Sequence, residues 1–398
     1  MFDFRDLPDG VAAQTIGVHG GQLTSPHMEN AEAIYMTSGF VYGSAAEAEA
    51  AFKGDIERYV YSRYANPTVS MFEERLRLLE GAEACMATGS GMAAVFAALA
   101  CQLAAGDRIV ASRALFSSCH VIVTQILPRF GVETVLVDGA DVSAWEKALS
   151  KPAKLAFLET PSNPTLEIID LAAVAKLAHA AGAVLVVDNV FATPILQKPL
   201  ALGADIVTYS TTKHIDGGGR SLGGAVLGSK EFVTEKLLPF LRHTGPALSP
   251  FNAWIALKGL ETLELRVKTA AASAGRIADY LAENSAVAGV IYPGRPDCPG
   301  HELARKQMSG FGTIVSFRLK GGKESCFRML DALRTIRISN NLGDAKSLIC
   351  HPDTTTHAKV AAEEKARLGI GADLVRLSVG LESVDDLIAD LRAALQAG

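Results

Sequence analysis

The chain has 398 residues, of which 49% are hydrophobic and 20% are charged, and its net charge at pH 7 is −5. This length is enough for two or three domains with sizeable cores. A mildly acidic chain lacks the basic surface that nucleic acids and anionic membranes require, so we expect it to bind neither. The longest apolar stretch, 92–105, contains Gln102 and is too short to span a bilayer.

The N-terminus and the cysteines indicate a cytoplasmic protein. The opening residues, MFDFRDLPDG, are acidic where a signal peptide is basic and apolar. The six cysteines are scattered, and none forms a C-x-x-C pair. A zinc site needs closely spaced ligands, and a secreted scaffold is denser in cysteine. We therefore expect reduced thiols and no bound metal.

Residues 1 to about 60 show only weak periodicity. This pattern predicts an arm that needs another surface to pack on. From about 70 to 230, short β-rich runs alternate with helical stretches. The predicted helices are 69–79, 92–103 and 171–181, and the predicted strands are 108–111, 134–137, 155–158, 184–187, 206–209 and 225–227. Apolar strands between helices indicate an α/β fold with a mainly parallel sheet covered on both faces.

The C-terminal third predicts a smaller α+β domain. Ser249 and Pro250 are typical of the start of a helix, with serine as the cap and proline in the first position. We expect this helix to continue to about Asn284 and to bridge two domains. Beyond it, strands at 312–319 and 375–379 alternate with helices at 323–333 and 383–395.

A glycine-rich turn, GSGM at 89–92, opens the helix predicted from Met92. Helix N-termini present free N–H groups and a positive dipole end, so they bind phosphate. The simplest alternative is a flexible helix start. Another is a dinucleotide site, because Gly89, Gly91 and Ala94 satisfy G-x-G-x-x-A. That alternative requires an acidic residue after the next strand, whereas Asp107 precedes it, which disfavours an NAD-dependent oxidoreductase.

Two strand ends carry polar groups that complete a possible cofactor site. Asp188 follows one buried strand, and Ser210, Thr212 and Lys213 follow the next. Taken alone, the aspartate is most simply interpreted as a cap of the following loop, and the lysine as a solvated surface charge. Together with a phosphate cradle they supply what pyridoxal 5′-phosphate (PLP) needs: donors for its phosphate, a carboxylate for its pyridine nitrogen and an amine for its aldehyde.

The chain resembles the Cys/Met-metabolism PLP enzymes, which include cystathionine synthases and lyases, methionine γ-lyases and homoserine-ester sulfhydrylases. The resemblance runs from about Thr15 to the C-terminus. It is carried by ordered motifs: YSRYANPT at 61–68, SGM at 90–92, ETPSNP at 159–164, VDN at 187–189, STTK at 210–213, LGD at 342–344 and VRLSVGLE at 375–382.

The resemblance implies PLP fold type I, the aspartate-aminotransferase-like fold, and a homotetramer built from active dimers. It divides the chain into an arm at 1–63 that contributes to the neighbouring subunit, a PLP-binding domain at 64–255 and a C-terminal domain at 256–398. It assigns Lys213 to the Schiff base and Asp188 to the pyridine nitrogen. The other implied cofactor contacts are Gly91, Met92, Ser210 and Thr212 at the phosphate, Asn163 at the phenolic oxygen, and Tyr61 and Arg63 across the subunit interface. Arg376 and Asn341 are implied to bind the substrate, although Arg376 alone could be a strand-edge charge.

Two residues depart from the family pattern. Phe116 stands where the family usually has a tyrosine that stacks on the PLP ring, and it has no proton to give. Proton transfer then falls on Lys213, helped by Tyr61. His214 follows the lysine where the family usually has an aromatic residue, and we interpret it as structural.

Within the family, three features resemble the bacterial enzymes that join O-succinylhomoserine and sulfide to give homocysteine and succinate in methionine biosynthesis. These are Phe116, HIDGGGR at 214–220 and SNNLGDAKSL at 339–348. Tyr64 stands where cystathionine γ-synthases tend to have arginine, and Ser118 where methionine γ-lyases tend to have cysteine. Cystathionine γ-synthase, O-acetylhomoserine sulfhydrylase and methionine or cystathionine γ-lyase activities remain alternatives.

Overall fold

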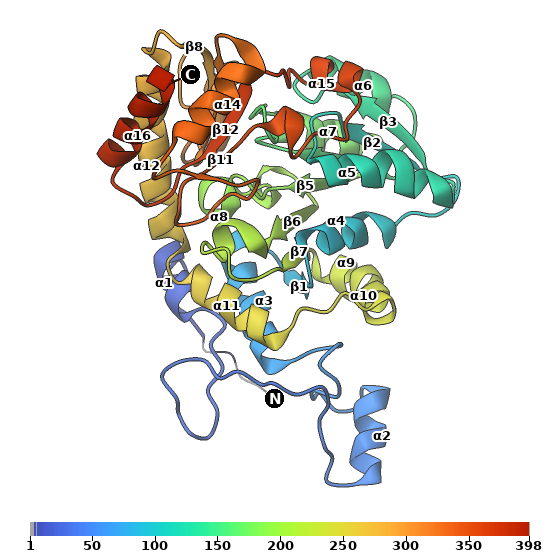
Figure 1. Cartoon of the computed structure of the whole chain (residues 1–398). Helices are drawn as coiled ribbons and strands as arrows, with labels where there is room; N and C mark the ends of the chain where they lie inside the picture. The colour runs from blue at the N-terminus through green and yellow to red at the C-terminus, as the bar shows by residue number, and fades with distance from the viewer. Residues whose placement is uncertain (1–3, 5, 398) are drawn as a thin grey trace.

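Two sheets of unequal size organise the chain, one within residues 84–228 and one within residues 287–378 (Figure 1). The computed structural model describes residue 4 and residues 6–397, so the outermost positions of the predicted arm and C-terminal domain (1–3, 5 and 398) lie outside the described residues. The predicted α/β architecture, with a smaller C-terminal α+β part, is confirmed.

The larger sheet has seven strands in the order β1-β7-β6-β5-β4-β2-β3. They are β1 (Ala84–Thr88), β2 (Arg108–Ser112), β3 (Glu133–Val137), β4 (Leu155–Glu159), β5 (Val184–Asp188), β6 (Ile206–Ser210) and β7 (Gly224–Gly228). Strand β7 runs antiparallel to β1 and β6, and the other pairs are parallel. The predicted mainly parallel sheet is therefore confirmed, with β1 as an added edge strand.

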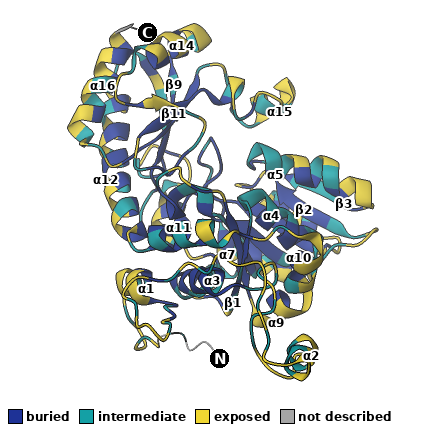
Figure 2. Ribbon diagram, turned by 60° about the horizontal axis from the view of Figure 1, so that its bottom comes forward, coloured by how far each residue is buried: buried dark blue, intermediate teal, exposed yellow. Residues whose placement is uncertain are grey.

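Helices cover both faces of this sheet, so its strands are the most deeply buried part of the molecule (Figure 2). Alternate residues of one strand enter different cores: Ile109 and Ala111 pack under one layer of helices, and Val110 packs under the other. The first layer holds α4 (Gly91–Ala100), α5 (Ser117–Val121), α9 (Lys230–Phe232) and α10 (Leu238–Thr244). The second holds α3 (Pro67–Glu80), α6 (Val142–Leu149), α7 (Leu171–Ala180), α8 (Thr193–Leu196) and α11 (Pro250–Leu260).

The smaller sheet has the order β10-β11-β12-β9-β8 and is mostly antiparallel. Its strands are β8 (Val287–Ile291), β9 (Ile314–Leu319), β10 (Arg337–Ile338), β11 (Leu348–Cys350) and β12 (Leu374–Ser378). One face packs on α12 (Leu263–Ala282), α14 (Gly322–Ala332) and α16 (Val384–Ala397). The remaining elements are short: α13 (His301–Gln307), α15 (Ala362–Arg367) and the helical turns η1 (Ile122–Ile126), η2 (Leu127–Phe130), η3 (Leu200–Leu202), η4 (Thr211–Ile215), η5 (Val233–Leu237) and η6 (Pro352–Thr354).

The single long helix predicted over 250–284 is wrong, because the structure has two helices, α11 and α12, separated at Glu261 and Thr262. Pro250 does occupy the first helical position, but the Ser249 side chain makes no capping hydrogen bond. At the break, the carbonyl oxygen of Gly259 accepts a hydrogen bond of 2.6 Å from the Arg266 guanidinium. This side chain satisfies an acceptor near the C-terminal end of α11, so the chain turns there without leaving that acceptor unpaired.

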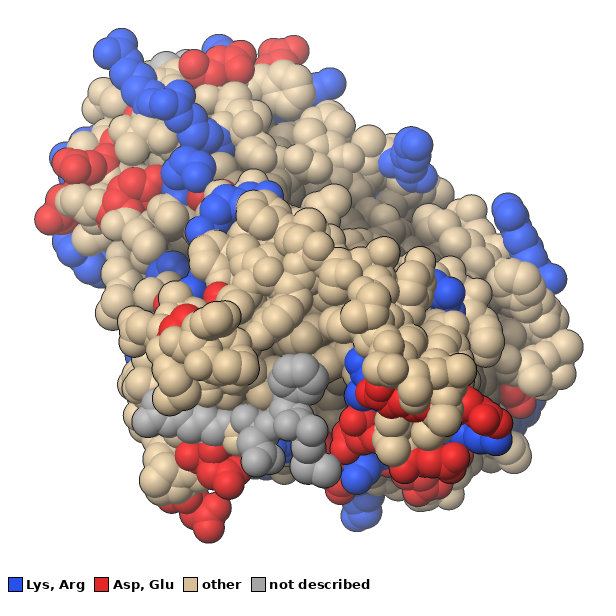
Figure 3. All heavy atoms as spheres, turned by 90° about the horizontal axis from the view of Figure 1, so that it is seen from below, with Lys and Arg blue, Asp and Glu red and all other residues tan. Residues whose placement is uncertain are grey.

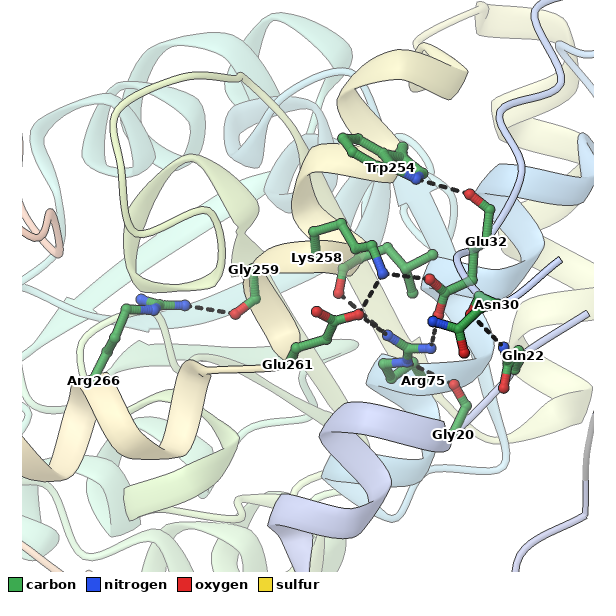
Figure 4. A network of polar contacts seen from close by, with 11 residues as sticks. Gly20, Gln22, Asn30, Glu32, Arg75, Trp254, Lys258, Gly259, Glu261 and Arg266 are labelled. Atoms are coloured by element: carbon green, nitrogen blue, oxygen red, sulfur yellow. Dashed lines mark hydrogen bonds and ion pairs between the residues drawn. The ribbon is translucent and has the colours of Figure 1, made fainter.

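The N-terminal arm is anchored at its root and projects beyond it. Helix α1 (Ala13–His19) packs on the body, whereas α2 (Ala45–Lys53) buries no residue and stands apart below it in Figure 1. The root is a buried network in which the Glu32 carboxylate accepts from Arg75 of α3 and from Lys258 of α11, the latter at 2.6 Å (Figure 4). Burial alone raises the pKa of Glu32, but the hydrogen bonds from Lys258 and Arg75 outweigh it and lower that pKa.

Candidate active site

Three neighbouring parallel strands end at one edge of the large sheet and carry the polar groups of the site. Strands β4 and β5 end at Glu159 and Asp188, which lie opposite each other in register. Strand β6 ends at Ser210 and leads directly into the turn that carries Lys213. Ligands of open α/β sheets bind at this carboxyl edge, and the sequence places its candidate cofactor residues there.

A cavity of about 500 Å³ opens at this edge and brings most of the predicted site residues together. The predicted residues that line it are Gly91, Met92, Phe116, Asn163, Asp188, Ser210, Thr212, Lys213 and Arg376. Further walls come from Ser117, Ser118 and Glu159 of the large domain and from Asn340, Leu342, Thr355 and Thr356 of the C-terminal part. The two parts of the chain therefore meet at the cavity.

One end of the cavity is suited to an anion. Helix α4 begins at Gly91, and the Ser90 side chain caps only the N–H of Ala93, at 3.1 Å. The first N–H groups of α4 therefore remain available. A side chain at position 91 would place its Cβ 2.6 Å from the Cβ of Ser210, so only glycine lets α4 approach the end of β6. Ser210 and Thr212 add hydroxyl groups to the same wall.

Two buried carboxyl groups lie side by side in the cavity wall. Burial raises the pKa of Asp188 to about 6, partly offset by the N–H of Val190, which donates to its carboxylate at 3.1 Å. Burial, and then the charge of Asp188, raises the pKa of Glu159 well above its ordinary value. Glu159 accepts N–H bonds from Phe116 at 2.5 Å and Asn163 at 3.0 Å. Burial therefore favours the protonated form of both carboxyl groups, and a cationic ring nitrogen beside Asp188 would favour its ionised form.

Glu159 belongs to the ETPSNP motif at 159–164, but the sequence does not predict a role for it. Its carboxylate holds the backbone of two residues that face the cavity, Phe116 and Asn163. The available signal was positional, because Glu159 ends the strand next to that of Asp188.

Lys213 is the candidate amine. Its backbone (φ −94°, ψ −128°) departs from helical values inside η4, and its Nζ donates to Oδ1 of Asn341 at 2.6 Å. Burial, and then the charge of Arg376, lowers the pKa of Lys213 to about 8. At neutral pH, a larger fraction of the Lys213 amine is therefore neutral and nucleophilic than in an exposed lysine. Asn341 is not part of the cavity wall, but it contacts the group that is.

Arg376 lies on β12, between β9 and β11, and only 1% of it is exposed, so the strand-edge alternative is wrong. One nitrogen donates to Oδ1 of Asn163 at 3.0 Å, and another donates to the carbonyl oxygens of Asn340 (2.9 Å) and Asn341 (3.3 Å). Among the described residues, no ion pair joins a carboxylate to Arg376, and its buried Nε has no hydrogen-bond partner. A fixed guanidinium without a counter-ion is suited to a ligand carboxylate.

Two predicted residues, Tyr61 and Arg63, do not reach the cavity of their own chain. Tyr61 is 41% exposed at the end of the arm. The Arg63 guanidinium lies over the rings of Tyr61 (5.4 Å) and Tyr64 (4.9 Å) and donates to the carbonyl oxygen of Arg242. Both side chains therefore lie on the surface, and neither contributes to the cavity of its own chain.

His214 and Asp107 take structural positions. The His214 ring is buried, its Nε2 lies 2.8 Å from Oγ1 of Thr313, and burial lowers its pKa to about 3. The Asp107 carboxylate accepts the N–H of Ala104 at 2.8 Å in the turn before β2. It is thus committed to a turn, which removes the acidic residue that a dinucleotide site would need.

The residues present fit PLP. The cavity offers an amine on Lys213, a carboxylate on Asp188, an open helix N-terminus and an apolar ring wall at Phe116. The Thr208 hydroxyl in the same wall is buried and has no partner among the described residues, so it has a hydrogen bond to give to a bound group. The part of the chain that the structure describes contains no cluster of potential metal ligands, no disulfide and no helix long and apolar enough to cross a membrane.

Known proteins agree with this geometry. The chain is 58% identical over 395 residues to the O-succinylhomoserine sulfhydrylase of Mycobacterium tuberculosis H37Rv, covering 98% of this chain and 97% of that protein. It is 48% identical over 389 residues to the O-succinylhomoserine sulfhydrylase of Pseudomonas aeruginosa PAO1, covering 98% and 96%. The metY protein of Campylobacter jejuni, whose crystal structure contains N′-pyridoxyl-lysine-5′-monophosphate, matches with a TM-score of 0.93 at 30% identity, covering 97% and 100%.

A family model described as Cys/Met metabolism PLP-dependent enzyme matches residues 14–396. The predicted resemblance is confirmed over the length on which it was based. The chain therefore belongs to the Cys/Met metabolism family of PLP-dependent enzymes, with the α/β architecture of PLP fold type I.

Proposed function

We propose that this enzyme replaces the succinyl ester of O-succinylhomoserine with sulfide, giving homocysteine and succinate for methionine biosynthesis. The C–O bond at Cγ breaks, succinate takes its electron pair, and a C–S bond forms at the same carbon. The single observation that carries the proposal is that Lys213, Asp188 and Arg376 line one cavity. The relatives at 58% and 48% identity that bear the name O-succinylhomoserine sulfhydrylase support this substrate.

Each cavity residue takes a role that its chemistry supports. PLP supplies an electron sink when bound. Lys213 carries the cofactor and moves the proton at Cα, for which its lowered pKa is suited. Arg376 binds the α-carboxylate, with Asn341 beside it, and Phe116 stacks on the ring. The remaining proposed contacts are Asp188 at the pyridine nitrogen, Asn163 at the phenolic oxygen, and Gly91, Met92, Ser210 and Thr212 at the phosphate.

The cavity wall favours a small nucleophile. Its charged side chains, among the described residues, are Glu159, Asp188, Lys213 and Arg376, and the proposed roles occupy the last three. A cysteine nucleophile would bring an ammonium and a carboxylate, each of which needs a partner when desolvated. Sulfide has no such requirement. Phe116 also lacks the acidic proton that a tyrosine would offer for elimination, so replacement is favoured over lyase chemistry.

We further propose that two chains share each site, with Tyr61 and Arg63 of one reaching the cofactor of the other, in a cytoplasmic homotetramer built from such dimers. The proposed division is an arm at 1–63, a PLP-binding domain at 64–255 and a C-terminal domain at 256–398. The position of Tyr61 and Arg63 outside their own cavity supports the sharing. The underside, from which the arm projects, has a wide uncharged stretch bordered by charged side chains, as a subunit contact would require (Figure 3).

The test is a product analysis with purified enzyme. O-succinylhomoserine and O-acetylhomoserine are each supplied with sulfide, with cysteine and with no nucleophile, and homocysteine, cystathionine and 2-oxobutyrate are quantified. We expect homocysteine from the succinyl ester and sulfide to form fastest. Methionine and cystathionine are also supplied alone. Dominant cystathionine from the esters would make the enzyme a γ-synthase, and rapid 2-oxobutyrate from methionine or cystathionine would make it a lyase.

A further inference from the structure

A segment of the C-terminal part, residues 352–367, lies against the cavity. It contributes Thr355 and Thr356 to the wall and then forms α15. Figure 1 shows α15 next to the helices of the large domain, away from the other C-terminal helices. Its one ion pair to that domain, among the described residues, joins Glu364 to Arg113, whose Nη1 lies 3.1 Å from both carboxylate oxygens.

The proposed substrate carries a second carboxylate at the end of its succinyl group, and that carboxylate needs a cation. The cavity wall offers two among the described residues, Lys213 and Arg376, and both have other proposed roles. The acetyl ester has no distal carboxylate and makes no such demand. A residue that supplies the missing cation would therefore distinguish the two esters.

Two arginines lie close in sequence to residues that line the cavity, Arg113 before Phe116 and Arg220 before Leu222, and they differ in how firmly they are held. Arg220 donates to the carboxylate of Asp216 at 2.8 Å and to its carbonyl oxygen at 2.6 Å, and Asp216 is buried. Removing Arg220 from Asp216 would leave a buried charge unpaired. Arg113, by contrast, has Glu364 as the only hydrogen-bonding partner of its guanidinium among the described residues.

Arg113 is also well placed. It follows β2 directly and precedes Phe116 by three residues, and Phe116, Ser117 and Ser118 all line the cavity. His120, one turn further along α5, feels the charges of both Arg113 and Glu364, and its buried Nε2 has no partner among the described residues. An unsatisfied ring nitrogen beside the ion pair is a second group that can bind the oxygen atoms of a ligand.

We propose that Arg113 recognises the distal carboxylate of the substrate and that Glu364 holds this position until the substrate displaces it. This inference rests on the proposed function and adds a specificity-determining residue to it. The exchange replaces one carboxylate with another, so Arg113 stays paired. Helix α15 buries none of its residues, so the released Glu364 reaches water. Binding of the succinyl ester then frees α15 from the large domain, and binding of the acetyl ester does not.

The test compares KM for the two esters, with sulfide as the nucleophile, in variants of the holoenzyme. Arg113→Ala should raise KM for the succinyl ester roughly tenfold or more and leave KM for the acetyl ester within about twofold. Arg113→Lys should restore part of the preference. Glu364→Ala removes the competitor and should lower KM for the succinyl ester several-fold. Glu363→Ala, the matched control, removes a neighbouring charge of α15 whose partner is Arg367, and should change neither KM.

A second measurement probes the distal carboxylate apart from the succinyl ester, with succinate and acetate as inhibitors and the reaction of O-acetylhomoserine with sulfide as the assay. Succinate should inhibit the wild-type enzyme competitively more strongly than acetate, and Arg113→Ala should remove that difference. Equal changes for both esters, or a selective loss in Arg220→Ala instead, would overturn the assignment. An intact cofactor absorbance band and an unchanged melting temperature exclude misfolding. If wild-type enzyme makes no homocysteine from the succinyl ester, the proposed function fails; if it does and the variants keep wild-type preference, only this inference fails.

Discussion

The carboxyl edge of the large sheet and the N-terminal arm are opposite kinds of structure. At the sheet edge, Asp188, Glu159 and Arg376 are nearly inaccessible to water and have partners in their own chain. In the arm, α2 buries no residue, Val41 is 90% exposed and Phe52 is 69% exposed. The arm nevertheless has an ordered root at Glu32, Arg75 and Lys258.

This difference separates two requirements of the proposed chemistry. The groups proposed to act on the amino acid lie within one chain, where burial shifts the pKa values of Asp188 and Lys213. Tyr61 and Arg63 lie outside the cavity of their own chain, on an arm with exposed apolar residues. An exposed apolar projection on an anchored root is typical of a segment that packs on a second chain.

The largest effect is expected at the carboxyl edge of the large sheet, when the amine of Lys213 is removed. Lys213→Ala should abolish the absorbance band of covalently held PLP near about 420 nm and lower turnover by more than ~10³-fold. The reason is that Lys213 is the amine in the cavity wall beside Asp188. Absorbance spectra and initial rates are the measurements, and a variant that keeps both would contradict the assignment.

The next largest effect concerns Arg376. Arg376→Lys should lower kcat/KM by about 1.5–3 kcal/mol, or roughly 10- to 150-fold, because lysine cannot form the two parallel bonds of a guanidinium. The spectrum of bound cofactor should remain normal, since Arg376 is assigned to the substrate. Unchanged kcat/KM would show that the α-carboxylate binds elsewhere.

A mixture of two inactive variants sharpens the comparison between edge and arm. In the proposed shared site, Arg63→Ala would damage the neighbour's site and Lys213→Ala its own, so a mixed dimer should contain one intact site. Random exchange should recover about a quarter of wild-type activity. Activity is measured after subunit exchange has been demonstrated with differently tagged chains. No recovery despite exchange would place Arg63 outside the partner's site.

The smallest expected effect is a shift in the titration of Lys213. Because burial and the charge of Arg376 lower its pKa to about 8, the amine of the cofactor-free protein should react with an amine-selective reagent increasingly as pH rises through about 8. Below that pH the protonated amine is unreactive. Removing the positive charge in Arg376→Ala should move the midpoint upward, and mass spectrometry of the labelled peptide gives the profile. A midpoint near that of exposed lysines would refute the buried environment.

Local sequence patterns predict most strands of the large sheet and the site residues that follow them. The apolar runs that end at Asp188 and Ser210 fixed which residues reach the carboxyl edge, because strands of this length end where their apolar character ends. The edge strand β1 was missed, since its run at 84–88 follows α3 with no separating turn signal other than Gly81. The break between α11 and α12 was missed because it depends on Arg266, a side chain of the next helix.

The rest of the site depends on contacts that no local pattern encodes. Asn341 contacts Lys213 from 128 positions away, and Glu364 pairs with Arg113 from 251 positions away. Such pairs arise only when the C-terminal sheet is docked on the large domain. Glu159 is an intermediate case. The sequence indicates that it ends a strand, but its two N–H donors, Phe116 and Asn163, come from loops whose course is set by packing.

The ionic root of the arm has a consequence for how this protein can change over evolutionary time. Glu32 faces two cations, Arg75 and Lys258, and Arg75 is fully buried. Losing one partner of such a group typically leaves an uncompensated charge at a cost of about 3–5 kcal/mol, a large part of the 5–15 kcal/mol that keeps a domain folded. Replacing the whole group with apolar residues of similar size carries no such penalty. Glu261 also forms ion pairs with both cations. We therefore expect these four positions to be substituted together across related sequences, with single replacements rare and mostly confined to lineages where a second change has compensated the first.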